Sequence, residues 1–185
     1  TWKYSFKWKP AEENTIDFLV TSQKDKSGAP KVSNIFKNGM DTGAENQVLQ
    51  YKSYVLRCGF DERRHGFLNP CQMVLEGEVP ETRSSDDSKN YKPVPFYPTN
   101  PYDETAHKCN IILRNDKAMQ PQAMCENNDI IENNTIVEFR WDETRDPEFR
   151  WVPLRVRYDK TAELRAGFPN YGNAYHVANS NWSTI

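Results

Sequence analysis

Three arginines, an aspartate and a lysine lie within residues 150–160 of this 185-residue chain, in the segment RWVPLRVRYDK. The segment predicts a β-strand, in which alternate side chains face the same way, so that Arg155, Arg157 and Asp159 project together. Arginines gathered in this way are typical of a site that binds an anion, and phosphate matches the guanidinium N–H groups best. An edge strand that is protected by its charges is the alternative.

A second cationic strand is predicted at the opposite end of the chain. In residues 1–10, Lys3, Ser5, Lys7 and Lys9 alternate with four aromatic side chains. The alternation predicts a strand with its aromatic side buried and its cationic side free. Two cationic strands in one domain favour a phosphate ligand over a merely protected edge.

Composition limits the fold and the partners. The mean hydropathy is −0.88, 27% of the residues are charged, and twelve prolines stand against eight glycines. These values favour short strands around a modest, aromatic-rich core. Because the net charge is −2, phosphate must be bound by local clusters rather than by overall charge. No apolar run reaches the roughly 18–20 residues that span a bilayer, and residues 1–7 lack the apolar part of a signal peptide, so a cytoplasmic, non-secreted protein is expected.

The cysteines do not indicate a metal or a disulfide framework. Cys58, Cys71, Cys109 and Cys125 are far apart with no C-x-x-C pair, and the three histidines are equally scattered. This spacing does not favour structural zinc, and we assign no metal ligand. Four reduced and mostly buried thiols are expected.

The pattern of the remaining chain predicts a mainly β domain. Antiparallel strands are expected at residues 15–21, 50–59, 109–114, 134–141 and 151–158, with a brief extended segment at 32–36. Residues 80–108 are expected to form a long, irregular, Pro-rich insertion whose prolines exclude a central strand. Short helices are predicted at 160–166, where Gly167 and Pro169 end the helix, and from residue 174 onward. An oligonucleotide/oligosaccharide-binding (OB) barrel fits these elements, and a β-sandwich is the alternative.

Two segments resemble motifs of GTP-dependent mRNA capping enzymes. Phe6-Lys-Trp-Lys-Pro10 with Asn14-Thr-Ile-Asp-Phe18 resembles the lysine-bearing motif V, and Trp151-x-x-Leu-Arg-Val-Arg-Tyr-Asp-Lys160 resembles the closing motif VI, R-x-R-x-D-K. Both occur in the family's order with an OB-sized interval. The tail at 170–185 resembles the segment that leads to a cap methyltransferase domain in the multifunctional enzymes of large cytoplasmic DNA viruses.

The resemblance implies a division of the chain. Residues 1–10 would be the last strand of a nucleotidyltransferase domain or the hinge from it, and 11–168 the OB domain, with the insertion at about 80–108. Residues 169–185 would link to the methyltransferase domain. In that family a lysine in a K-x-D-G motif attacks the α-phosphate of GTP, with Mg or Mn present, and passes GMP to 5′-diphosphate RNA. This chain holds no K-x-D-G, so alone it is expected to be inactive and to bind no cofactor.

The same resemblance assigns roles to the cations. Lys7 and Lys9 would contact the α-phosphate of GTP, while Arg157 and Lys160 would meet the β- and γ-phosphates when the OB domain closes. Asp159 would orient the pyrophosphate or those cations. Arg155 fits the pattern either as a phosphate ligand or as a structural residue. Strand alternation alone puts Lys160 opposite Arg157, unless the strand turns into a helix there.

Two other functions stay open: a non-catalytic OB module that binds single-stranded nucleic acid, and the OB domain of a polynucleotide ligase. Trp8 and Trp151 are expected in the core. Tyr171 and Trp182 are expected to pack against the C-terminal domain of a longer polypeptide.

Overall fold

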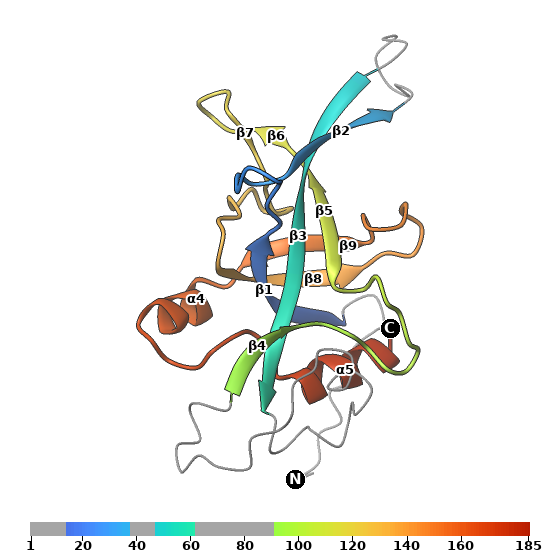
Figure 1. Ribbon diagram of the computed structural model, residues 1–185, viewed down its shortest axis with the longest axis vertical. Helices are drawn as coiled ribbons and strands as arrows, with labels where there is room; N and C mark the ends of the chain where they lie inside the picture. The colour runs from blue at the N-terminus through green and yellow to red at the C-terminus, as the bar shows by residue number, and fades with distance from the viewer. Residues whose placement is uncertain (1–13, 38–46, 62–90) are drawn as a thin grey trace, which may run out of the picture.

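The computed structural model describes residues 14–37, 47–61 and 91–185 (Figure 1). The predicted strand at residues 1–10, with Lys7, Trp8 and Lys9, lies outside the described residues, and so does Cys71. Within the described part, no helix is long and apolar enough to cross a membrane.

The fold is a mainly β, antiparallel sheet with two C-terminal helices. Its central path runs β2-β3-β1-β8-β9, and β4 and β5 both pair with β3. These strands are β1 (Thr15–Ser22), β2 (Val32–Lys37), β3 (Gln47–Asp61), β4 (Tyr91–Pro95), β5 (Lys108–Ile112), β8 (Thr135–Trp141) and β9 (Trp151–Val156). A small hairpin of β6 (Arg114–Asn115) and β7 (Pro121–Gln122) stands apart, and α4 (Tyr158–Arg165) and α5 (Tyr175–Ser183) follow. The strands predicted between residues 15 and 158 are confirmed, with bounds shifted by a few residues. In the described residues no ladder joins β5 to β9 to close a barrel.

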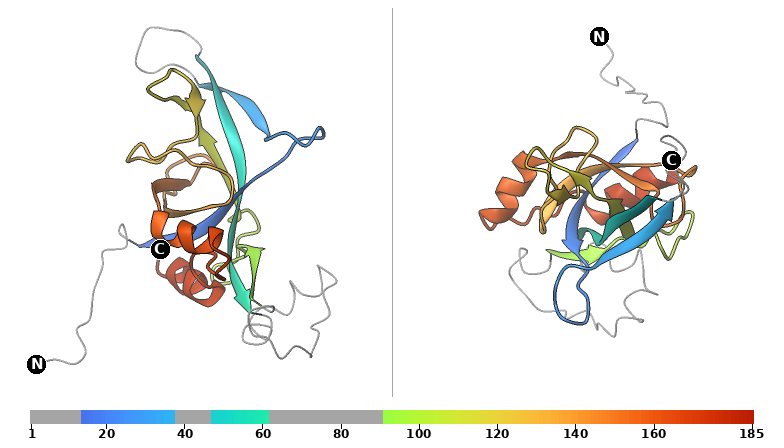
Figure 2. Two further views of the ribbon diagram at one scale, coloured as in Figure 1. Left: turned by 90° about the vertical axis from the view of Figure 1, so that its left-hand side faces the viewer. Right: turned by 90° about the horizontal axis from the view of Figure 1, so that it is seen from above.

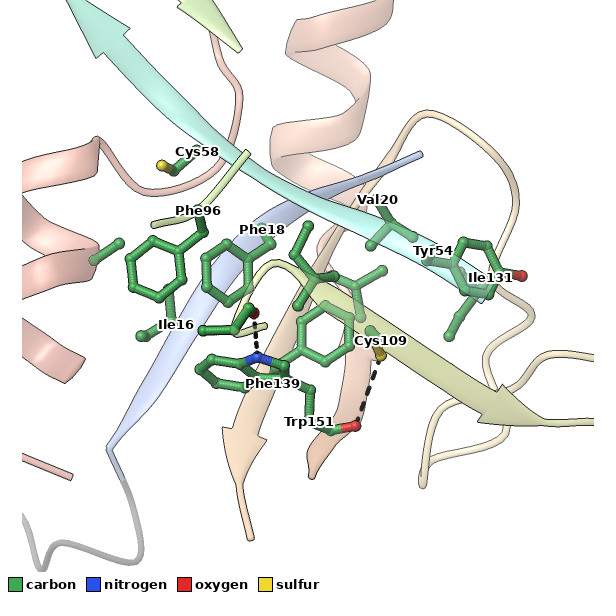
Figure 3. Packing of buried hydrophobic residues seen from close by; sticks show 14 of the residues in the cluster. Ile16, Phe18, Val20, Tyr54, Cys58, Phe96, Cys109, Ile131, Phe139 and Trp151 are labelled. Atoms are coloured by element: carbon green, nitrogen blue, oxygen red, sulfur yellow. Dashed lines mark hydrogen bonds between the residues drawn. The ribbon is translucent and has the colours of Figure 1, made fainter. Parts of the chain in front are cut away.

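The core follows from alternation along β1. Ile16, Phe18 and Val20 are fully buried on one face, as strand periodicity requires. The Phe18 ring lies 5.0 Å from that of Phe96 and 5.1 Å from that of Trp151, as Figure 3 shows. The indole Nε1 of Trp151 donates to the Ala106 carbonyl at 2.7 Å, so this large ring is buried without an unpaired donor. The prediction that Trp151 is a core residue is confirmed.

Part of the Pro-rich region is more regular than predicted. Residues 91–95 form β4, which pairs with residues 57–61 of β3, so the prediction of an irregular segment is wrong here. Within the described sheet β4 has β3 as its one partner strand. Pro93 and Pro95 are tolerated because an edge strand has no second neighbour that needs their missing N–H groups.

The two helices begin and end close to the predicted positions. Helix α4 begins at Tyr158, and Gly167, with φ of +91°, ends it in the left-handed conformation that glycine favours. Helix α5 packs on the sheet through Tyr175, Ala178 and Trp182, which recur at helical spacing and are buried.

The expected role of Trp182 at an interdomain contact is wrong, because this side chain lies in the core of the described domain. The same expectation for Tyr171 stays a prediction. Trp182 is 5% exposed and its ring lies 4.8 Å from that of Trp141. Its indole Nε1 donates to the Pro101 carbonyl at 2.9 Å. Tyr171 stacks on Tyr91 with ring centroids 5.5 Å apart. Helix α5 therefore contributes buried side chains to the core of this domain.

Candidate phosphate-binding site

The predicted motif spans the junction between β9 and α4. Strand β9 ends at Val156, and the Arg157 N–H donates to the Ile136 carbonyl at 2.7 Å. The Arg157 carbonyl then accepts the Thr161 N–H at 2.9 Å, which opens the helix. Lys160 therefore lies about one helical turn after Arg157, on the same side. The helix removes the conflict that strict strand alternation would impose on these two cations.

Both cations converge on one buried oxygen. The Lys160 Nζ lies 2.6 Å from Asp17 Oδ2, and the Arg157 Nη1 lies 2.9 Å from the same atom. The Asp17 side chain is 7% exposed, against 22% for Arg157 and 24% for Lys160. A buried carboxylate needs such partners, because removal from water disfavours its charge. Asp17 therefore holds the two cations side by side, while part of each cationic side chain stays exposed to solvent.

Asp17 is itself held firmly by the backbone around it. Since Ile16 and Phe18 point into the core, Asp17 must face the other side of β1. Its N–H donates to the Asn173 side-chain oxygen at 2.8 Å, and its carbonyl accepts the Asn173 N–H at 2.9 Å. Gly172 has φ of +83°, and a Cβ there would lie 2.5 Å from the Asp17 carbonyl oxygen. The glycine is thus required for this close approach.

Three more charged residues surround Asp17, Arg157 and Lys160. Arg155 Nε lies 2.7 Å from Glu138 Oε2, and that oxygen is 3.9 Å from Arg157 Nη1. Asp159 accepts from Arg157 Nε at 3.4 Å and Nη2 at 3.3 Å, and this guanidinium lowers the pKa of the Asp159 carboxyl. We call these six residues the Asp17 cluster: Asp17, Glu138, Arg155, Arg157, Asp159 and Lys160.

The cluster can accept an anion at its outer side. Arg157 and Lys160 each keep N–H groups that no described partner uses, since each cation has more donors than its ion pairs engage. Asp159 is 68% exposed, and an exposed ion pair of this kind contributes little to stability, because water screens it. Asp159 is therefore the more easily displaced of the two carboxylates that contact Arg157, and Asp17 is the buried one.

Four of the six predicted site residues come together here, and Lys7 and Lys9 lie outside the described residues. Arg155 is 56% exposed and pairs with Glu138, which fits either role that the sequence leaves open. Sequence reasoning missed Asp17 and Glu138 as site residues. The available signal was a carboxylate at the alternate position between two buried apolar residues of a strand, which predicts a cationic partner.

The cluster does not overlap the hollow that lies beside β5. A hollow of about 850 Å³ lies between β5 and the 142–150 connection, and its lining includes Asn110, Phe149 and Pro153 but no residue of the cluster. Among the described residues no group of three or more His, Cys, Asp and Glu side chains could hold a metal ion. Cys58, Cys109 and Cys125 are buried free thiols, as predicted.

The described residues define an antiparallel, mainly β domain with a mixed cationic and anionic cluster at a strand-to-helix junction. Over 183 residues the chain is 30% identical to a protein of Acanthamoeba polyphaga mimivirus described as a probable mRNA-capping enzyme. That match covers 97% of this chain and 12% of the mimivirus protein, so the chain is homologous to a small region of it. No family model matches, and no solved structure does.

Proposed function

We propose that this chain is the OB domain of a viral mRNA-capping guanylyltransferase and that the Asp17 cluster closes over the phosphates of GTP. The observation that carries the proposal is the convergence of Arg157 and Lys160 on one buried carboxylate oxygen. Homology to a region of a probable capping enzyme supports the same function.

The strand order supports an OB fold. Strands β5, β3, β1, β8 and β9 lie next to one another in that order, which is the order of a five-stranded Greek-key barrel left partly open. The open seam would lie between β5 and β9. At one end of this seam the Asn110 N–H donates to the Glu148 carbonyl at 2.8 Å. A β-sandwich is less well supported, because β1 pairs on both sides within one continuous sheet.

The chemistry of nucleotidyl transfer needs the cluster's cations. Charge develops on the α-phosphate and on the leaving pyrophosphate, and positioned donors in a closed site stabilise that charge. Arg157 and Lys160 would bind the β- and γ-phosphates, with Asp17 fixing their positions before the nucleotide arrives. Asp159 would hold Arg157 until a phosphate oxygen replaces it. Arg155 would add a weaker contact.

The rest of the reaction would belong to other parts of a longer polypeptide. A preceding nucleotidyltransferase domain would supply the nucleophilic lysine and the Mg or Mn site, and Lys7 and Lys9 would reach the α-phosphate. A methyltransferase domain would follow. The acceptor would be 5′-diphosphate RNA in a cytoplasmic viral factory or virion.

The cluster can be tested in the full-length polypeptide that contains this chain. Arg157→Ala and Lys160→Ala should each reduce labelling with radioactive GTP about 100-fold or more, the usual loss when one charge-stabilising donor is removed. The matched control is Arg165→Ala, on the same helix, which removes an exposed ion pair with Glu132 and should label normally.

Normal labelling of both cluster variants would contradict the proposal. It would favour a non-catalytic OB module that binds single-stranded nucleic acid. Residues 1–185 alone should remain unlabelled. Labelling by ATP rather than GTP in the full-length protein would favour a polynucleotide ligase.

A further inference from the structure

A second cationic feature lies at the far end of β1, in the turn at residues 23–31. Lys24, Lys26 and Lys31 are exposed. Among the described residues none of these three lysines has an ion-pair partner. Three lysines against a single aspartate give this turn a local positive charge in a chain whose net charge is −2.

The one aspartate of the turn is occupied in shaping it. Asp25 Oδ1 accepts from the Ser27 N–H at 2.8 Å, the Ser27 hydroxyl at 2.6 Å and the Ala29 N–H at 3.1 Å. The Asp25 N–H donates to the Ala29 carbonyl at 2.8 Å, and Gly28 takes a φ of +86°. The carboxylate therefore folds the turn and leaves its lysines free to meet a ligand.

A further cation lies on β3 between the turn and the Asp17 cluster. Arg57 pairs with Leu19 across the β1–β3 ladder, and its Nε donates to the Thr21 hydroxyl at 3.1 Å. Thr21 lies on the same face of β1 as Asp17, because their positions differ by an even number of residues. Positive side chains thus follow β1 from the Asp17 cluster, past Arg57, to the lysine turn.

Aromatic rings accompany these charges. Tyr97 and His107 have ring centroids 4.7 Å apart, and both are half-buried. The His107 carbonyl accepts the Leu56 N–H at 2.8 Å, so the pair lies against β3 at the residue before Arg57. Cations next to half-buried aromatic rings suit single-stranded nucleic acid, where phosphates meet the cations and bases stack on rings. An acidic peptide would use the cations alone.

We propose that the 5′-proximal nucleotides of single-stranded RNA bind along β1, with their phosphates contacting Arg57 and the lysine turn of Lys24, Lys26 and Lys31. The inference rests on the proposed function, since it places the RNA acceptor relative to the Asp17 cluster. It adds a binding surface that acts in GMP transfer to RNA and not in the formation of enzyme–GMP.

The first test measures how salt weakens the binding of a 5′-diphosphate oligoribonucleotide. For single strands the slope of log K against log salt is about −0.7 per phosphate contact, so a K24A/K26A/K31A variant should have a slope smaller by about 2. The matched control is Lys117→Ala. Lys117 follows Asp116 in a turn built by the same aspartate hydrogen bonds, and Figure 2 shows the β6–β7 hairpin pointing away from the 23–31 turn.

The second test separates the two steps in the full-length polypeptide. The triple variant should form enzyme–GMP like the unmodified protein, yet transfer GMP to RNA more slowly, with recovery at low salt. An unchanged salt slope and unchanged transfer would overturn the RNA surface while leaving the proposed function intact. Normal GTP labelling of Arg157→Ala would instead count against the proposed function alone. Polyglutamate of equal charge should displace the bound oligoribonucleotide less well than unlabelled RNA does. If it competes as strongly as RNA, the RNA assignment is overturned in favour of an acidic protein partner.

Discussion

The substitution Asp17→Asn tests whether a buried carboxylate positions the cations of the cluster. Asparagine keeps the size and one oxygen acceptor, but it leaves the Arg157 and Lys160 charges, now 2.9 and 2.6 Å from Oδ2, without their shared negative partner. Removing one member of a fully buried ion pair costs about 3–5 kcal/mol. Because these two cations remain 22% and 24% exposed, water can take over part of that role. We expect a loss of about 2 kcal/mol.

The assay is thermal unfolding of residues 1–185, in which a loss of this size lowers Tm by about 4–8 °C. The control is Glu132→Gln, which breaks an ion pair of 3.2 Å whose side chains are 68% and 57% exposed. It should cost no more than about 0.5 kcal/mol.

A double-mutant cycle sharpens the test. If Asp17 acts through its cationic partner, the Asp17→Asn/Lys160→Met variant should lose less stability than the sum of the two single variants. Strict additivity, or a Tm for Asp17→Asn equal to that of the Glu132→Gln control, would refute the positioning role.

Two further substitutions test how the C-terminal segment is built into the domain. Gly172→Ala should lower the free energy of unfolding in urea by about 2 kcal/mol or more, because a Cβ there meets the Asp17 carbonyl oxygen. The control is Gly28→Ala, at a glycine with a similar φ but open space around it, which should cost about 1 kcal/mol. Equal losses would contradict the close approach. Trp182→Ala should cost about 3–5 kcal/mol because it leaves a cavity in the core, whereas Phe168→Ala, at a ring 62% exposed, should change stability by less than about 0.5 kcal/mol. A small effect of Trp182→Ala would contradict the position of this ring in the core.

The strands could be predicted from the sequence because alternation is a local property. The alternation of Ile16, Phe18 and Val20 predicts a strand and its buried face without information on the strands that pair with it. The turn of Arg157 and Lys160 toward one another was harder to predict, since it depends on the residue at which β9 gives way to α4. Helix start signals are weak here: Arg157 stands at the N-cap position without a side-chain capping bond.

Asp17 and Trp182 show why the rest could not be predicted. Asp17 lies far from Arg157 and Lys160 in sequence, and they meet only because β1 pairs with β8 and β8 pairs with β9. A tryptophan near the end of the sequence is compatible with an interface or with a core. The packing of α5 on the sheet places Trp182 inside the domain. Long-range pairing, rather than residue type, determines both positions.

The balance of charge in the cluster bears on how it would bind phosphate. Its three cations face three carboxylates in the described structure, so the site presents no large excess of positive charge. The carboxylates differ in exposure: Asp17 is 7% exposed and Asp159 is 68% exposed. An incoming phosphate would therefore displace Asp159 and keep Asp17, so that Arg157 exchanges one anionic partner for another without reorganising the buried pair. On the proposed function, closure over GTP is then an exchange at a site whose geometry already exists, and such preorganisation is what gives positioned charges their catalytic effect.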